Sequence, residues 1–210
     1  DVVEIGYRSL NTKKLLGLCA YSNDDFLTQI DNPTNLKIAA MINGYEIIED
    51  DYVSKLKRLF PNTAANTPLS IVRIASSFEN IKRLNLPIEW LKKRGFSVFV
   101  NITHSHELSE KDIIQISNSL YNCDVIYFAD SLGCITSDKI KDLISIIKVH
   151  VPGEIGFHAH DNFGLALSNS LKAIQYGCNW IDSTILGMGR GAGNTKTELL
   201  ALEISQYRNK

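Results

Sequence analysis

The sequence predicts an α/β fold, a parallel (β/α)8 TIM barrel that lacks its first β/α unit in the chain as given. Three observations lead to this prediction. Short apolar runs recur along the chain, amphipathic helical stretches alternate with them, and polar residues follow several of the runs directly. We expect residues 1–210 to form a single catalytic barrel domain that is incomplete at its N-terminus.

The apolar runs are interpreted as buried strands, because each is short and is bounded by polar or turn residues. In chain order they cover residues 2–7, 36–42, 70–75, 97–102, 124–129, 154–158 and 180–185. About seven strands leave an eight-stranded barrel one short. Since the chain begins at Asp1 directly on an apolar run, we expect the absent unit to be the first one.

Amphipathic stretches with helical spacing lie between the later strands, at residues 88–94, 112–121, 137–148 and 165–176. Ser109 and Thr136 are candidate N-caps of the second and third. Such alternation requires parallel strands joined by right-handed crossovers, in a closed barrel or an open doubly wound sheet. The barrel is favoured because no strand is followed by a GxGxxG turn, although both folds place their sites at strand ends.

Composition limits the classes of function. Lys and Arg number 22 against 23 for Asp and Glu, without long runs of either sign, so we expect a small-molecule partner and no nucleic acid or membrane. No apolar stretch approaches the roughly 20 residues that span a bilayer and no signal-peptide pattern is present, so a cytoplasmic location is expected. The cysteines are expected to be reduced thiols, because they are widely spaced: Cys19, Cys123, Cys134 and Cys178.

The sharpest chemical pattern is the segment from Gly156 to Asn162, which reads G-F-H-A-H-D-N. His158 and His160 stand two residues apart at the end of a strand, so their side chains point the same way while the chain is extended and could share one metal ion. Oxygen ligands completing the site would favour manganese, magnesium or cobalt over structural zinc. On spacing alone, packed or exposed histidines are an equal alternative.

A glycine-dense segment, residues 187–195, follows the last expected strand. Its backbone could approach a ligand closely, and as a phosphate cradle it would use Arg190 as the charge partner. A tight structural corner is the alternative, and the glycines alone favour it.

Three other polar features allow two interpretations each. Arg73 lies within an apolar strand, so it pairs with a carboxylate such as Glu4 or faces the barrel mouth to bind an anion. Asp130 closes its strand and is either an acceptor or base in the site or a helix N-cap. His104 and His106 are interpreted as a solvated loop pair, with a substrate or lid role as the alternative.

Five segments together resemble the metal-dependent aldolase and acyl-lyase barrels, the family of 4-hydroxy-2-oxovalerate aldolase, HMG-CoA lyase and 2-isopropylmalate synthase. They are residues 3–8, 72–75, 129–133, 158–166 and 187–198. The order H-x-H-D-N-x-G-L-A, then G-x-G-x-x-A-G-N, is more specific than either half alone. The 4-hydroxy-2-oxovalerate aldolase-like members look most similar.

The resemblance implies a lyase that cleaves or forms the carbon–carbon bond next to a 2-oxo acid, giving pyruvate and an aldehyde. It makes His158 and His160 ligands of a divalent ion (Mn, Mg or Co), with Asn194 beside the ion as a ligand in some relatives. Glu4, Arg73 and Asp130 would line the substrate pocket. The family's D-x-x-x-R-[DE] motif, with an aspartate ligand and a catalytic arginine, has no match here, so the catalytic residues stay unassigned.

Two alternatives remain open at this point. The chain could be a Claisen-type acyl-CoA lyase or synthase of the same family, although the segment 187–194 carries no cysteine, which argues mildly against the lyase branch. It could instead be a non-catalytic barrel that binds a metal or phosphate.

We favour truncation over true loss of the missing motif, because a seven-stranded barrel would leave two open strand edges. The resemblance also suggests an aldehyde dehydrogenase and a second copy of the chain, in a homodimer, as partners.

Overall fold

The computed structural model describes residues 2–11, 17–32 and 35–208, which fall into two compact units. The first unit comprises residues 1–101 with 119–124, and the second comprises residues 102–118 with 125–210. Each unit contains parallel strands and the helices that pack on them, and each has a core of its own.

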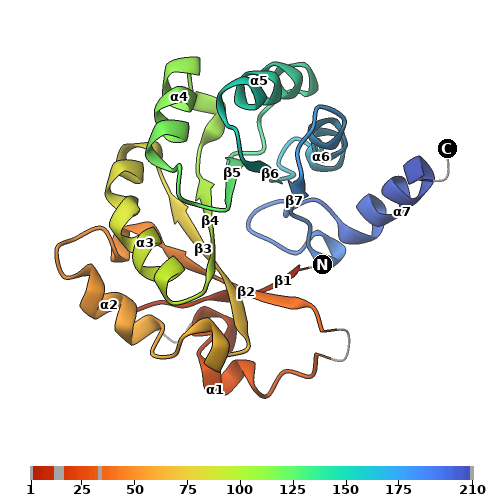
Figure 1. Ribbon diagram of the computed structural model, residues 1–210. Coiled ribbons are helices and arrows are strands. Elements are labelled where there is room, and N and C mark those ends of the chain that lie inside the picture. The colour runs from red at the N-terminus through yellow and green to blue at the C-terminus, as the bar shows by residue number, and fades with distance from the viewer. Residues whose placement is uncertain (1, 12–16, 33–34, 209–210) are drawn as a thin grey trace. The chain divides into compact units, whose positions relative to one another are not determined.

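The first compact unit carries the strands β1 (Val2–Tyr7), β2 (Lys37–Asn43), β3 (Leu69–Ser76) and nearly all of β4 (Ser97–Ile102). Its helices are α1 (Asp24–Leu27), α2 (Tyr52–Leu59) and α3 (Asn85–Lys93), with 3-10 turns at Leu18–Ala20, Gly44–Glu46, Ala64–Asn66 and Phe78–Leu84. Strand β2 pairs in parallel with β1 on one side and with β3 on the other. Figure 1 shows α2 and α3 side by side, outside these strands.

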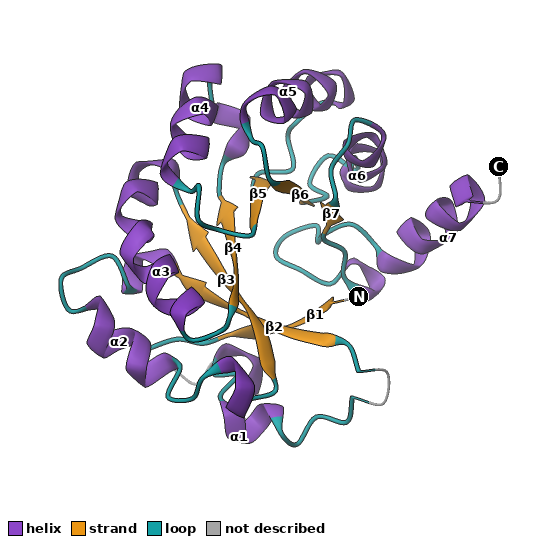
Figure 2. Ribbon diagram, viewed as in Figure 1, coloured by secondary structure: helices purple, strands orange, loops and turns teal. Residues whose placement is uncertain are grey.

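The second compact unit carries β5 (Val125–Asp130), β6 (Glu154–Ala159) and β7 (Trp180–Ile181). Its helices are α4 (Glu110–Ser119), α5 (Ser137–His150), α6 (Ala166–Gln175) and α7 (Thr197–Arg208), with 3-10 turns at Ser105–Glu107 and Ile185–Gly187. Strand β6 pairs in parallel with β5 and with β7. In Figure 2, α5 and α6 lie next to each other outside this group of strands.

Parallel strands in sequence order, alternating with helices, confirm the predicted α/β fold of a partial TIM barrel. Six strands lie within one residue of the predicted bounds at either end. The predicted strand 180–185 is wrong in length, since β7 ends at Ile181. The N–H of Thr184 donates to the carbonyl of Thr195, and the Thr184 carbonyl accepts from Thr197, so this part of the chain pairs with the segment that returns after the glycines.

The helix expected after Ser109 is fixed by a local cap. The Ser109 N–H and hydroxyl both donate to the Asp112 carboxylate, at 2.8 and 2.6 Å, and the Asp112 N–H points back to the Ser109 oxygen at 3.4 Å. This reciprocal arrangement is a capping box. Thr136 precedes α5 as predicted but makes no side-chain cap bond. Helices α1 and α2 were not among the helical stretches named from the sequence pattern.

The cores of the two units are built from strands that are buried on both faces. Strand β5 is buried at every position, and the interior of β2 is buried throughout. A strand covered on both sides must be apolar at consecutive positions, which explains the unbroken apolar runs of the sequence. Burial of each large apolar side chain contributes about 1.5–3 kcal/mol.

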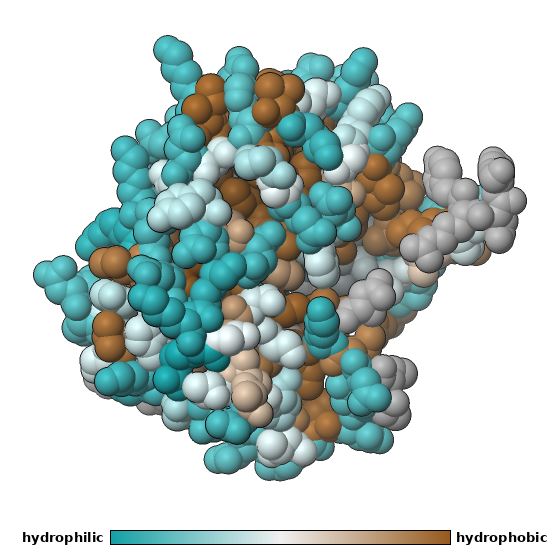
Figure 3. Space-filling view, in the orientation of Figure 1, coloured by the Kyte–Doolittle hydropathy of each residue, from teal (hydrophilic) through white to brown (hydrophobic). Residues whose placement is uncertain are grey.

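Some hydrophobic side chains remain at the surface of the second unit. Leu199 and Leu202 on α7 are 44% and 55% exposed, and the surface along α7 is partly brown in Figure 3. Within residues 2–11, 17–32 and 35–208, we find no helix with the length and hydrophobicity needed to cross a membrane.

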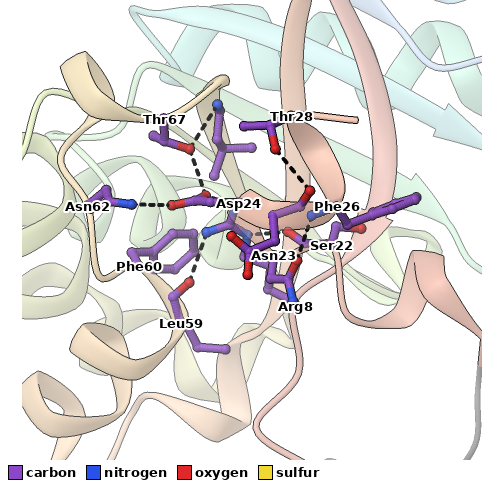
Figure 4. Close-up of polar contacts among 12 residues, drawn as sticks. Arg8, Ser22, Asn23, Asp24, Phe26, Thr28, Leu59, Phe60, Asn62 and Thr67 are labelled. Atoms are coloured by element: carbon purple, nitrogen blue, oxygen red, sulfur yellow. Dashed lines mark hydrogen bonds and ion pairs between the residues drawn. The ribbon is translucent and has the colours of Figure 1, made fainter. Parts of the chain in front are cut away.

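One buried ion pair organises the end of β1 in the first unit (Figure 4). Arg8 is only 3% exposed, and its guanidinium donates to the Ser22 carbonyl at 2.6 Å, to the Leu59 carbonyl at 2.9 Å and to the Asp24 carboxylate at 2.6 Å. The guanidinium also lies 5.1 Å from the centre of the Phe60 ring. A single cation therefore connects the chain after β1 to α1 and to the C-terminal end of α2.

Candidate functional site

His158 lies near the end of β6, and a carboxylate fixes the orientation of its ring. Its Nδ1 is 2.9 Å from a carboxylate oxygen of Asp182, which follows β7 directly, and both side chains are about four-fifths buried, at 20% and 18% exposure. Donation from Nδ1–H to the carboxylate leaves the lone pair on Nε2. This carboxylate–histidine arrangement is the one commonly found behind metal-ligating histidines.

His160 follows β6 and lies beside His158. The centres of the two rings are 5.0 Å apart, with the ring planes inclined at 76°. Burial lowers the pKa of His160, and the charges of His158 and Arg190 lower it further. The imidazole is therefore held in the neutral form, which is the form that binds metal ions.

The glycine segment turns back on itself and positions Asn194 beside His160, with which Asn194 forms an isolated β-bridge. The Asn194 N–H donates to the Gly187 carbonyl at 3.0 Å, and its side-chain amide donates to the Met188 carbonyl at 3.2 Å. Its Oδ1 is buried and has no hydrogen-bond partner among the described atoms. An unpaired buried amide oxygen is costly, and a cation would satisfy it.

Glycines are needed where this segment closes on itself. Gly193 has φ +94°, and a Cβ there would lie 2.1 Å from the Gly187 carbonyl oxygen. A Cβ at Gly189 would lie 2.4 Å from the side-chain nitrogen of Asn194. The tight-corner interpretation therefore has a structural basis, and the corner positions Asn194. The phosphate cradle with Arg190 stays a prediction.

Asp130, the last residue of β5, is fully buried. One of its carboxylate oxygens accepts the N–H of Cys134 and the other that of Ile135, each at 3.0 Å. It is not a helix N-cap, because α5 begins later, at Ser137. The carboxylate instead shapes the turn that follows β5, and its predicted contact with substrate stays a prediction.

Arg73 and Glu4 lie in the first compact unit and form an ion pair, with Arg73 Nη1 3.1 Å from Glu4 Oε2. The Arg73 side chain is 7% exposed and that of Glu4 is 27% exposed. The pairing interpretation of Arg73 is therefore confirmed. The predicted role of both residues in substrate binding stays a prediction.

The interpretation of His104 and His106 as a solvated loop pair is wrong for His106. His104 is exposed, whereas the His106 side chain is only 17% exposed. Ligand atoms of His106, Asp130 and Cys134 lie within 4.8 Å of one another. No other group of three or more His, Cys, Asp and Glu side chains in the described part of the chain is close enough for one ion, and this group contains neither His158 nor His160. The sequence analysis did not find this group, because His106 lies 24 residues before Asp130 and no pattern links it to Asp130 and Cys134.

Comparison with known protein families gives one match. The model of the family described as HMGL-like matches residues 63–209 of the chain. The matched range contains every residue of the second compact unit discussed above.

Curated proteins similar to this chain include 4-hydroxy-2-oxovalerate aldolases. It is 30% identical over 199 residues to 4-hydroxy-2-oxovalerate aldolase 2 of Nocardia farcinica, an alignment that covers 93% of this chain and 58% of that protein. It is 39% identical over 112 residues to 4-hydroxy-2-oxovalerate aldolase of Brevibacillus brevis, covering 52% of this chain and 32% of that protein. The chain thus spans a little over half the length of the former relative.

Two solved structures illustrate the structural similarity. The N-terminal domain of a Bacteroides vulgatus protein assigned as an aldolase has a TM-score of 0.88 and 31% identity, covering 100% of this chain and 69% of that chain. Hydroxymethylglutaryl-CoA lyase from Pseudomonas aeruginosa has a TM-score of 0.75 at 16% identity, covering 97% of this chain and 72% of that one. The second similarity, at so low an identity, concerns the fold alone.

Proposed function

The chain belongs to the HMGL-like family, and from this premise we propose that it is a divalent-metal-dependent aldolase, a lyase that cleaves or forms a carbon–carbon bond next to a 2-oxo acid. The observation that carries the proposal is the H-x-H pair at the end of β6, with Asp182 behind His158 and the unpartnered oxygen of Asn194 beside His160. The names of the curated relatives support a 4-hydroxy-2-oxo acid as the substrate, with pyruvate and an aldehyde as products.

The residues of the second unit suit a divalent ion. His158 would hold it through Nε2, since Nδ1 faces Asp182, and His160 would contribute a neutral imidazole. Asn194 offers a carbonyl oxygen that is buried and otherwise unsatisfied. Two nitrogen ligands and an amide oxygen are a donor set that manganese, magnesium or cobalt can share with oxygen atoms of a substrate.

When bound, such an ion would supply Lewis-acid chemistry, drawing electron density from the 2-oxo group of the substrate. The protein's part is to hold the ligands in a fixed geometry. Asp182 fixes the tautomer and the plane of the His158 ring, and the closed glycine segment fixes Asn194. Asp130 holds the turn after β5 through two backbone N–H groups.

The proposal is tested by two measurements on wild-type protein and on the double variant His158→Ala, His160→Ala. The first is the content of manganese, cobalt and magnesium after supplementation and removal of free ions. The second is pyruvate release from 4-hydroxy-2-oxo acids. We expect wild type to retain the ion and release pyruvate in an ion-dependent way, and the double variant to do neither.

His150→Ala is the matched control, because His150 lies at the end of α5, where its ring nitrogen contacts Glu110 at 2.9 Å on the surface. This variant should keep both properties. Equal ion content in wild type and in the double variant would contradict the metal site. Cleavage of an acyl-CoA substrate without pyruvate release would favour the Claisen-type alternative, and retention of the ion without either reaction would favour a non-catalytic barrel.

A further inference from the structure

His106, Asp130 and Cys134 bring a nitrogen, an oxygen and a sulfur ligand together in the second compact unit. One ligand atom from each residue lies within 4.8 Å of the other two. Around a tetrahedral zinc ion the ligand atoms stand about 3.3–3.8 Å apart, given metal–ligand bonds of about 2.0–2.3 Å. A separation of 4.8 Å exceeds this spacing by about 1.0–1.5 Å, so movements of that size would bring the three atoms to the spacing of a zinc site.

The backbone around the three residues is already held in place. The Asp130 carboxylate, fully buried, accepts the N–H of Cys134 at 3.0 Å, so the turn that carries the thiol is fixed to the end of β5. The Ser105 hydroxyl donates to the Ala129 carbonyl at 2.7 Å, which fixes the short 3-10 turn that carries His106 to the same strand end. The backbone positions of the three residues are therefore fixed by these hydrogen bonds.

The His106 ring supplies an independent indication that a ligand belongs here. Its Nδ1 is buried and has no hydrogen-bond partner among the described atoms. Its Nε2 lies 3.4 Å from the Glu107 carboxylate. With the proton on Nε2, directed at Glu107, the ring presents the Nδ1 lone pair, and a metal ion would satisfy a buried polar atom that otherwise costs about 1–3 kcal/mol.

Cys134 is compatible with this role. Burial raises the pKa of its thiol, and the negative charge of Asp130 raises it further. A divalent ion would displace the thiol proton to solvent as the sulfur–metal bond forms. Its two positive charges would balance the thiolate and the Asp130 carboxylate.

We propose that His106, Asp130 and Cys134 form a second metal site, distinct from the His158 and His160 pair, that binds Zn²⁺ or a similar borderline ion. The combination of imidazole, carboxylate and thiolate suits such an ion, and three protein ligands leave a fourth position for water or a small ligand. This inference does not depend on the aldolase proposal.

The experiment is a titration of metal-free protein with Co²⁺, observed by absorption in the near ultraviolet. A thiolate bound to Co²⁺ gives a charge-transfer band there, and the ligands proposed at His158, His160 and Asn194 contain no sulfur. We expect wild type to show the band, Zn²⁺ to abolish it by displacement, and His106→Gln to lower the Co²⁺ affinity by about tenfold or more. The Cys134→Ser variant should lack the band.

Two controls identify which cysteine and which site give the signal. Cys19→Ser, at an exposed free cysteine, should keep the band. The double variant His158→Ala, His160→Ala should also keep the band, even if it has lost pyruvate release. Failure of the aldolase proposal can then be distinguished from failure of the second metal site. Circular dichroism of the metal-free variants establishes that each is folded. Absence of the band in wild type, or its persistence in Cys134→Ser, would overturn the proposal, as would its loss in the double histidine variant.

Discussion

At the scale of single residues, hydrogen bonds decide which atoms remain available to a ligand. The contact of His158 Nδ1 with Asp182 leaves Nε2 as the only ring nitrogen that can bind a metal ion. The amide of Asn194 is oriented in a similar way, because its nitrogen donates to the Met188 carbonyl and its oxygen is left without a partner.

The substitution Asp182→Asn should therefore weaken metal binding without unfolding the protein. Loss of the negative charge removes the group that holds the Nδ1–H tautomer, and we expect the affinity for Mn²⁺ to fall by about 10- to 100-fold. Isothermal titration calorimetry of metal-free protein with Mn²⁺ measures this affinity. Asp138→Asn is the control, since the Asp138 side chain is fully exposed, and it should bind as wild type does. An unchanged affinity of Asp182→Asn for Mn²⁺ would show that Asp182 does not support metal binding.

At the scale of elements, the glycine segment acts as a closed corner rather than as a flexible loop. The Asn194 N–H bonds to the Gly187 carbonyl, and the Asp161 N–H bonds to the Gly193 carbonyl at 2.9 Å. The segment is thus attached to the chain that follows His160. A change in the corner should therefore alter the geometry of the candidate metal site.

Gly193→Ala tests the corner. The added methyl group would lie 2.1 Å from the Gly187 carbonyl oxygen, and the backbone has φ +94°, so we expect a loss of about 1–3 kcal/mol in the free energy of unfolding together with weaker metal binding. Urea unfolding measures the first effect and metal titration the second. Gly153→Ala, where no atom lies within 4 Å of the added carbon, should change stability by no more than about 0.5 kcal/mol. Equal behaviour of the two variants would show that the corner is not needed.

At the scale of the whole molecule, we expect the buried network around Arg8 and Asp24 to make the free energy of unfolding depend on pH. Burial by itself would raise the pKa of Asp24, but hydrogen bonds from Thr67, Asn62 and Arg8 and the charge of Arg8 outweigh it, so the pKa is lowered. A carboxyl with a lowered folded-state pKa contributes stability above its unfolded-state pKa of about 3.9, and this contribution is lost as the pH falls through the folded value.

We therefore expect the difference in unfolding free energy between wild type and Asp24→Asn to be largest near neutral pH and to shrink below about pH 3.9. Urea unfolding of both proteins across this range measures the difference. Asp138→Asn, at an exposed carboxylate, should differ little from wild type at any pH. A difference between wild type and Asp24→Asn that does not change with pH would contradict the role of the ionised carboxylate.

Much of the fold could be predicted because it depends on local patterns. Apolar runs such as Ser97–Ile102 form strands wherever both faces are covered, and the Ser109 capping box fixes the start of α4 from residues three positions apart. The short helix α1 was missed, since four residues carry too little periodicity to detect. The end of β7 was misplaced because its alternative partner, the stretch around Thr195, lies beyond the glycines.

The sequence by itself determined the parallel β/α order and the spacing of His158 and His160 at a strand end, because both follow from short-range periodicity. Only the tertiary structure decided which residues from distant parts of the chain come together in space. Asp182, directly after β7, reaches His158, and His106 approaches Asp130 and Cys134 from a different turn. Parallel strands bring their C-terminal ends to one edge whatever the length of chain between them, so these partners are close in space while nothing in the sequence places them together.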